Sequence, residues 1–85
     1  MKTIAIIDDD QHISDMLAEV LTKEGYAVSR AYSGTEALLL LAQRRPDLVL
    51  LDLMLPGLSG EEVLSHIAGI PVIVLSAKAD VQDKV

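Results

Sequence analysis

Residues 4–10 read Ile-Ala-Ile-Ile-Asp-Asp-Asp, a short apolar run that ends abruptly in three acidic residues. Apolar runs also occupy residues 48–51 and 72–75, which are followed directly by Asp52 and Ser76, and a more mixed segment lies at residues 26–31. Short continuous apolar runs are typical of strands that are buried on both faces of a parallel sheet. We therefore predict four strands at these positions.

The stretches between the predicted strands have the signals of helices. Residues 11–24 carry apolar side chains at helical spacing, namely Ile13, Met16, Leu17, Val20 and Leu21. Residues 33–36 and 59–62 are both capping boxes that precede apolar helical segments. The residues expected to end these helices are Gly25, Pro46, Gly69 and Pro71. Residues 80–85 are interpreted as the start of a further helix.

Strands that alternate with helices predict an α/β fold with a parallel sheet and right-handed crossovers. The length of 85 residues allows at most one domain. Ligands in such folds bind beyond the carboxyl ends of the strands. The residues at those ends are Asp8, Asp9, Asp52 and Ser76, so we expect them to form the functional site.

Composition excludes several classes of function. The net charge of −6 argues against direct nucleic-acid binding, which needs a basic face. The absence of cysteine excludes disulfides, thiolate metal sites and cysteine nucleophiles. No apolar run is long enough to span a membrane, and the first residues do not resemble a signal peptide, so a cytoplasmic location is expected.

Asp8, Asp9 and Asp52 come together if the first and third strands are neighbours. Carboxylates so close repel one another, and a hard divalent cation such as Mg²⁺ would hold all three ionised. A carboxylate beside such a cation can act as a nucleophile toward a phosphoryl group, with the Ser76 hydroxyl as a hydrogen-bond donor. Taken singly, Asp8 and Asp9 are equally typical of a solvated helix start, and Asp52 of a loop.

Neighbouring polar residues have simpler interpretations. Asp10 is expected to be the N-cap of the first helix rather than a ligand. His12 and His66 are expected on the surface, and Lys78 is expected to be a solvated lysine.

Three stretches together resemble a response regulator receiver domain of bacterial two-component signalling. They are Ile-Ile-Asp-Asp-Asp at 6–10, Asp-Leu-Met-Leu-Pro-Gly at 52–57 and Val-Leu-Ser-Ala-Lys at 74–78. The second stretch most resembles regulators in which a winged-helix DNA-binding domain follows the receiver and controls transcription. The resemblance implies a flavodoxin-like three-layer sandwich with strand order 2-1-3-4.

The resemblance also implies roles for particular residues. Asp52 matches the phosphoacceptor, which takes its phosphoryl group from a sensor histidine kinase. Asp8 and Asp9 match the Mg²⁺ ligands, and the backbone carbonyl of Met54 matches the group that completes the metal site. Ser76 matches the switch hydroxyl, and Ala77 matches the small residue that leaves room for the phosphoryl group.

The family has a fifth strand and a fifth helix, which have no counterpart in residues 1–85. We therefore expect a partial receiver domain without an output domain, and weakened phosphotransfer because the family's lysine lies at the end of that fifth strand. The fourth strand would then be an open sheet edge, from which we expect self-association or segment exchange.

Two alternative functions are a phosphatase and a scaffold module. A Mg²⁺-dependent phosphatase of the haloacid dehalogenase type needs a second aspartate two residues after the nucleophile, where this sequence has Met54. A folding fragment or scaffold module would keep the receiver fold without phosphotransfer. Receivers catalyse only their own phosphorylation and dephosphorylation, so we expect no enzyme with a metabolic substrate.

Overall fold

The apolar runs form a parallel sheet with the predicted strand order. The computed structural model describes residues 1–53, 55, 60–67 and 69–75. Its strands are β1 (Thr3–Ile7), β2 (Ala27–Ala31), β3 (Leu48–Leu51) and β4 (Val72–Val74), in the order β2-β1-β3-β4. Every pairing is parallel, with Ile7 opposite both Ala31 and Leu51 and with Leu51 opposite Val74.

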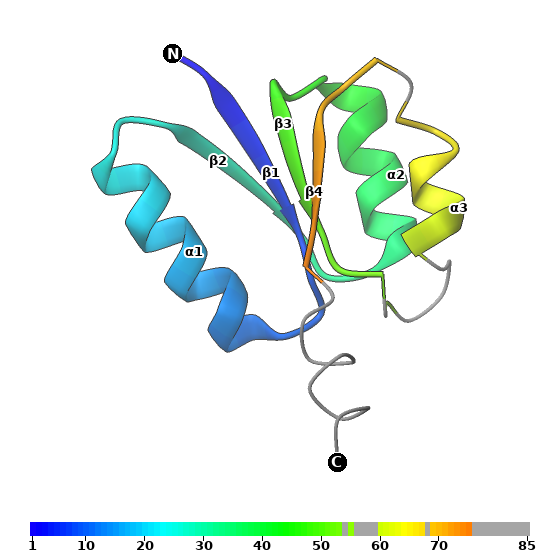
Figure 1. Cartoon of the computed structure of the whole chain (residues 1–85), viewed down its shortest axis with the longest axis horizontal. Helices are drawn as coiled ribbons and strands as arrows, with labels where there is room; N and C mark the ends of the chain where they lie inside the picture. Colours follow the sequence, from blue (N-terminus) through cyan, green and yellow to red (C-terminus); the bar gives the residue numbers. More distant parts are fainter. Residues whose placement is uncertain (54, 56–59, 68, 76–85) are drawn as a thin grey trace.

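Helices cover both faces of this sheet (Figure 1). Helix α1 (Gln11–Lys23) lies on one face, and α2 (Gly34–Gln43) and α3 (Gly60–Leu64) lie on the other. Alternate residues of the strands face opposite sides of the sheet. On one side, Ile4, Ile6 and Leu50 pack against α1. The opposite layer contains Ala5, Ile7, Val49 and Leu51 together with residues of α2 and α3. The arrangement confirms the flavodoxin-like three-layer fold.

Helix α1 does not bury the face that its apolar spacing predicts. Its buried residues are Ser14 and Ala18, whereas Met16 and Val20 are 57% and 53% exposed. The small side chains of Ser14 and Ala18 lie at the contact with the sheet, and Leu17 and Leu21 pack against the same core while partly exposed. The helical period was therefore correct, but the centre of the buried face was wrong.

The predicted helix ends are confirmed for α1 and α2. Gly25 has a φ of 94°, a conformation that disfavours residues with a Cβ atom, directly after the C-cap of α1. Ser33 caps α2 as predicted, because its Oγ accepts a hydrogen bond from the amide of Glu36 at 3.1 Å. The Glu36 carboxylate accepts from the amide of Tyr32 at 2.8 Å, one residue before the amide that a full capping box would use. None of the described helices is long and apolar enough to cross a membrane.

Helix α3 is shorter than the sequence predicts. It ends at Leu64, and the chain continues through tighter turns in which the amide of Ile67 bonds to the carbonyl of Leu64 at 3.1 Å. Ile67 still reaches the core and is 4% exposed. The expected cap at Ser59 and the expected helix at residues 80–85 lie outside the described residues.

Strand β4 lies at one end of the sheet in the described part of the chain, and it pairs there with β3. Ile73 and Val74 are 52% and 43% exposed. Ile73 lies opposite Leu50, and therefore on the sheet face that α1 covers. The expected self-association through this edge stays a prediction.

Candidate functional site

The aspartates at the ends of β1 and β3 are positioned by the sheet itself. The backbone hydrogen bonds between strands continue one residue past the ends of β1 and β3. The Asp8 amide donates to the Ala31 carbonyl at 3.1 Å. Likewise the Asp52 amide donates to the Ile7 carbonyl at 2.9 Å. Both residues therefore have backbones held by the neighbouring strand, which fixes where their side chains start.

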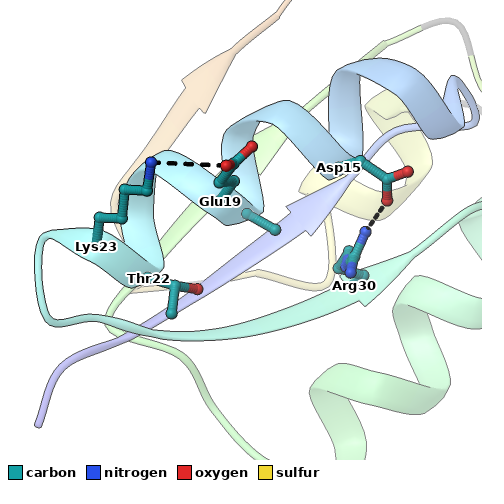
Figure 2. Close-up of a pocket in the computed structure, with 6 residues that line it drawn as sticks. Asp15, Glu19, Thr22, Lys23 and Arg30 are labelled. Atoms are coloured by element: carbon teal, nitrogen blue, oxygen red, sulfur yellow. Dashed lines mark hydrogen bonds and ion pairs between the residues drawn. The ribbon is translucent and has the colours of Figure 1, made fainter.

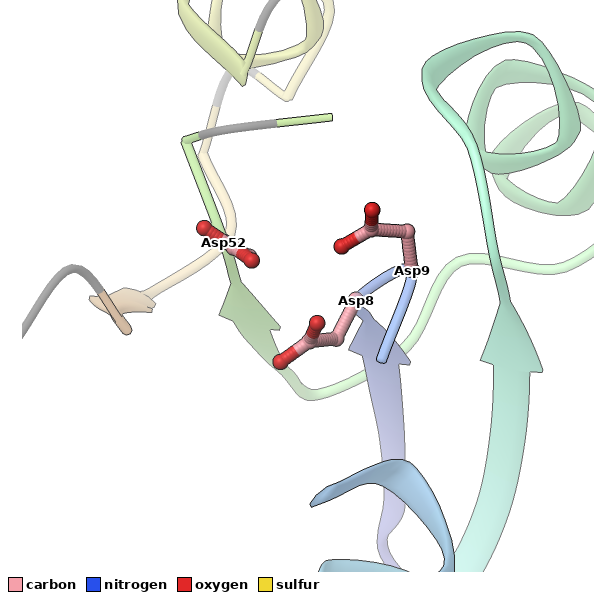
Figure 3. Close-up of side chains that lie close together, drawn as sticks. All are labelled: Asp8, Asp9 and Asp52. Carbon is pink, nitrogen blue, oxygen red and sulfur yellow. The ribbon is translucent and has the colours of Figure 1, made fainter. Parts of the chain in front are cut away.

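Three carboxylates converge at this edge (Figure 3). Asp8 and Asp9 follow β1 and face Asp52, which follows β3, and one oxygen from each lies within 4.8 Å of the others. Asp8 and Asp52 are 1% and 0% exposed, whereas Asp9 is exposed to solvent. The structure therefore brings together the three acidic residues that the sequence predicted.

The cluster has the chemistry of a hard-cation site. Mg²⁺ takes oxygen ligands at about 2.1 Å, so opposite ligands lie roughly 4.2 Å apart. The 4.8 Å spread of the three oxygens is close to that spacing. Asp9 is exposed at one side of the cluster, whereas Asp8 and Asp52 are buried, and a divalent cation would offset the mutual repulsion of the three carboxylates.

Asp10 is not part of the cluster, as predicted. Its side chain caps α1, because Oδ1 accepts hydrogen bonds from the amides of His12 at 3.0 Å and Ile13 at 3.2 Å. Its own amide donates to Oδ1 of Asp8 at 2.9 Å. Sequence reasoning missed this second contact, although an aspartate side chain often bonds to the backbone two residues later.

The remaining predicted site residues, Met54, Ser76 and Ala77, lie outside the described residues, as does Lys78. His12 and His66 are exposed, as predicted.

A separate open depression of about 510 Å³ lies on the surface between α1 and β2 (Figure 2). Four of its charged side chains form two ion pairs. Arg30 pairs with Asp15, and Lys23 Nζ lies 3.6 Å from Oε2 of Glu19. The hydrogen bond that the Arg30 guanidinium donates to the Asp15 carboxylate raises the pKa of Arg30 above its usual value. None of the three clustered aspartates lines this depression.

Comparison with known proteins agrees with this geometry. Residues 4–85 match the response regulator receiver domain family. The chain is 45% identical over 85 residues to "DNA-binding response regulator MtrA" of Mycolicibacterium paratuberculosis, covering 96% of this chain and 38% of that protein. The match to the protein of the same name in Mycobacterium leprae has the same identity and coverage. The chain thus spans well under half the length of these relatives.

Solved structures give the same result. The response regulator TrrA from Thermotoga maritima, crystallised in complex with Mg²⁺–BeF, has a TM-score of 0.83 and 40% identity, covering 91% of this chain and 70% of that one. A CheY-like receiver domain from Methanospirillum hungatei has a TM-score of 0.84 and 31% identity, covering 95% of this chain and 71% of that one. With its fold and acidic cluster, the chain belongs to the response regulator receiver domain family.

Proposed function

We propose that this chain is the phosphoacceptor of a two-component phosphorelay. Asp52 receives a phosphoryl group from a phosphohistidine on a sensor histidine kinase, and Asp8, Asp9 and Asp52 hold the Mg²⁺ that the reaction needs. The observation that carries the proposal is the convergence of these three carboxylates within 4.8 Å at the carboxyl edge of the sheet. The family match and the Mg²⁺–BeF complex of the Thermotoga relative support the same assignment.

Asp52 acts as the nucleophile in this reaction. A carboxylate oxygen of Asp52 attacks phosphorus, the bond from phosphorus to the histidine nitrogen breaks, and its electron pair stays with the imidazole. Burial of Asp52 and its fixed backbone keep the nucleophile in one place, which lowers the entropy cost of in-line attack. Asp8, Asp9 and Asp52 would hold Mg²⁺, which would neutralise the charge on the transferring oxygens.

Three further roles follow from the resemblance and belong to the proposal. The Met54 carbonyl completes the metal site, the Ser76 hydroxyl donates to the phosphoryl group, and Ala77 leaves room for that group. The outcome of the transfer is a shift between two conformations rather than turnover of a metabolic substrate.

The partners follow from charge and from the relatives. A domain with net charge −6 makes no direct contact with nucleic acid, so control of transcription would come from a DNA-binding domain elsewhere in the parent protein. The relatives named as DNA-binding response regulators support that output. We place the protein in the cytoplasm, where it meets a sensor histidine kinase.

The test is intact mass spectrometry after incubation with Mg²⁺ and acetyl phosphate. The wild-type chain should gain one phosphoryl group, and Asp52→Asn should gain none. Asp47→Asn is the matched control, because Asp47 precedes β3 at its other end and bonds to the Thr3 amide at 2.8 Å. A folded wild-type chain that gains no phosphoryl group would contradict the proposal and favour a scaffold module of receiver fold.

A further inference from the structure

Asp10 connects the start of helix α1 to the acidic cluster through two different groups. Its carboxylate accepts hydrogen bonds from the amides of His12 and Ile13, at 3.0 and 3.2 Å. Its amide donates to Oδ1 of Asp8 at 2.9 Å. One residue therefore caps the helix with its side chain and holds a cluster carboxylate with its backbone.

The two contacts depend on the same backbone conformation. Asp10 has φ −84° and ψ 108°, the extended geometry of an N-cap residue. The cap holds Asp10 in that conformation, and the conformation points its amide at Asp8. If the cap is lost, the first turn frays and the amide no longer has a fixed direction.

The orientation of Asp8 matters because its carboxylate is buried. With Oδ1 held by the Asp10 amide, the side chain has a defined rotation in which an oxygen faces Asp9 and Asp52 (Figure 3). A cation that binds an already oriented carboxylate loses less free energy to ordering than one that must order it.

We infer that Asp10 is a positioning residue for the cation site, which acts through Asp8 and is not itself a ligand. The inference rests on the proposed function, because it takes the cluster to bind Mg²⁺. Of the three consecutive acidic residues, Asp8 and Asp9 are then cation ligands and Asp10 is the positioning residue. It also makes the coupling reciprocal: bound Mg²⁺ tightens the first turn of α1 to the degree that the cap strengthens Mg²⁺ binding.

Two variants with the same net charge distinguish the effect of the helix cap from the effect of the lost carboxylate charge. Asp10→Asn and Asp10→Ala both remove the carboxylate charge, but asparagine caps helices about as well as aspartate and alanine does not. Isothermal titration calorimetry with MgCl₂ alone should give a Kd about fivefold weaker for Asp10→Ala than for Asp10→Asn, which is the ratio expected for one lost cap. Ser33→Ala is the matched control, because it removes the cap of α2 and should leave the Mg²⁺ Kd at the wild-type value.

Amide hydrogen exchange supplies a readout independent of affinity. Mg²⁺ should slow exchange at His12 and Ile13 in the wild type and in Asp10→Asn, and should have a smaller effect in Asp10→Ala. Equal Kd values for the two Asp10 variants would overturn the inference and leave the proposed function intact. If the wild-type chain and all of the variants show no measurable Mg²⁺ binding, both this inference and the proposed function are overturned.

Discussion

Ser14 provides a quantitative test of how α1 packs on the sheet. The residue is fully buried, and its Oγ has no hydrogen-bond partner among the described residues. A buried hydroxyl without a partner costs about 1–3 kcal/mol of stability, and replacing serine by alanine in a helix adds a few tenths of a kcal/mol. We therefore expect Ser14→Ala to raise the free energy of unfolding by about 1 kcal/mol, even though it removes a polar atom.

The assay is urea denaturation followed by circular dichroism. With a slope of about 1–2 kcal/mol per molar urea, the midpoint should rise by roughly 0.5–1 M. Ser33→Ala makes the same chemical change at the N-cap of α2 and should lower stability by about 1 kcal/mol, because the Glu36 amide loses its acceptor. A Ser14→Ala variant that is destabilised as much as Ser33→Ala would refute the packing described for α1.

Three further predictions concern the cluster, the sheet edge and a turn. Mg²⁺ at about tenfold over its Kd should stabilise the wild type by about 1.4 kcal/mol, measured as a rise in the thermal midpoint, and Asp9→Asn should abolish most of that rise. Ile73→Lys, which places a charge on the half-exposed edge strand β4, should reduce self-association measured by light scattering; unchanged association would place the contact elsewhere. Gly25→Ala should lower the free energy of unfolding by about 1–2 kcal/mol because φ is 94° there, and a neutral result would contradict that turn geometry.

Sequence patterns predicted the four strands and their parallel pairing, whereas the strand order 2-1-3-4 came from the resemblance to receiver domains. Continuous apolar runs indicate strands buried on both faces, and the β-α alternation requires parallel pairing with right-handed crossovers. The convergence of Asp8 and Asp52 then follows, since both residues come directly after neighbouring strands. Caps at Asp10 and Ser33 and the left-handed turn at Gly25 were local signals and were also correct.

Features that depend on packing between elements could not be derived in this way. The burial of Ser14 and Ala18, rather than of Met16 and Val20, depends on how α1 is oriented against the sheet. A helical period gives the spacing of a face but cannot rank two adjacent faces that are both partly apolar. The early end of α3 at Leu64 has a similar origin, because Ile67 reaches the core from a tighter turn.

The most direct test of the central claim is to locate the phosphoryl group. The chain is incubated with acetyl phosphate, with and without Mg²⁺, and the acyl phosphate is reduced with borohydride, which converts a phosphorylated aspartate to homoserine that peptide mass spectrometry identifies. We predict conversion at Asp52 alone, and only when Mg²⁺ is present. Conversion at Asp8 or Asp9, or conversion at Asp52 that does not depend on Mg²⁺, would contradict a single metal-dependent phosphoacceptor site built from these three residues.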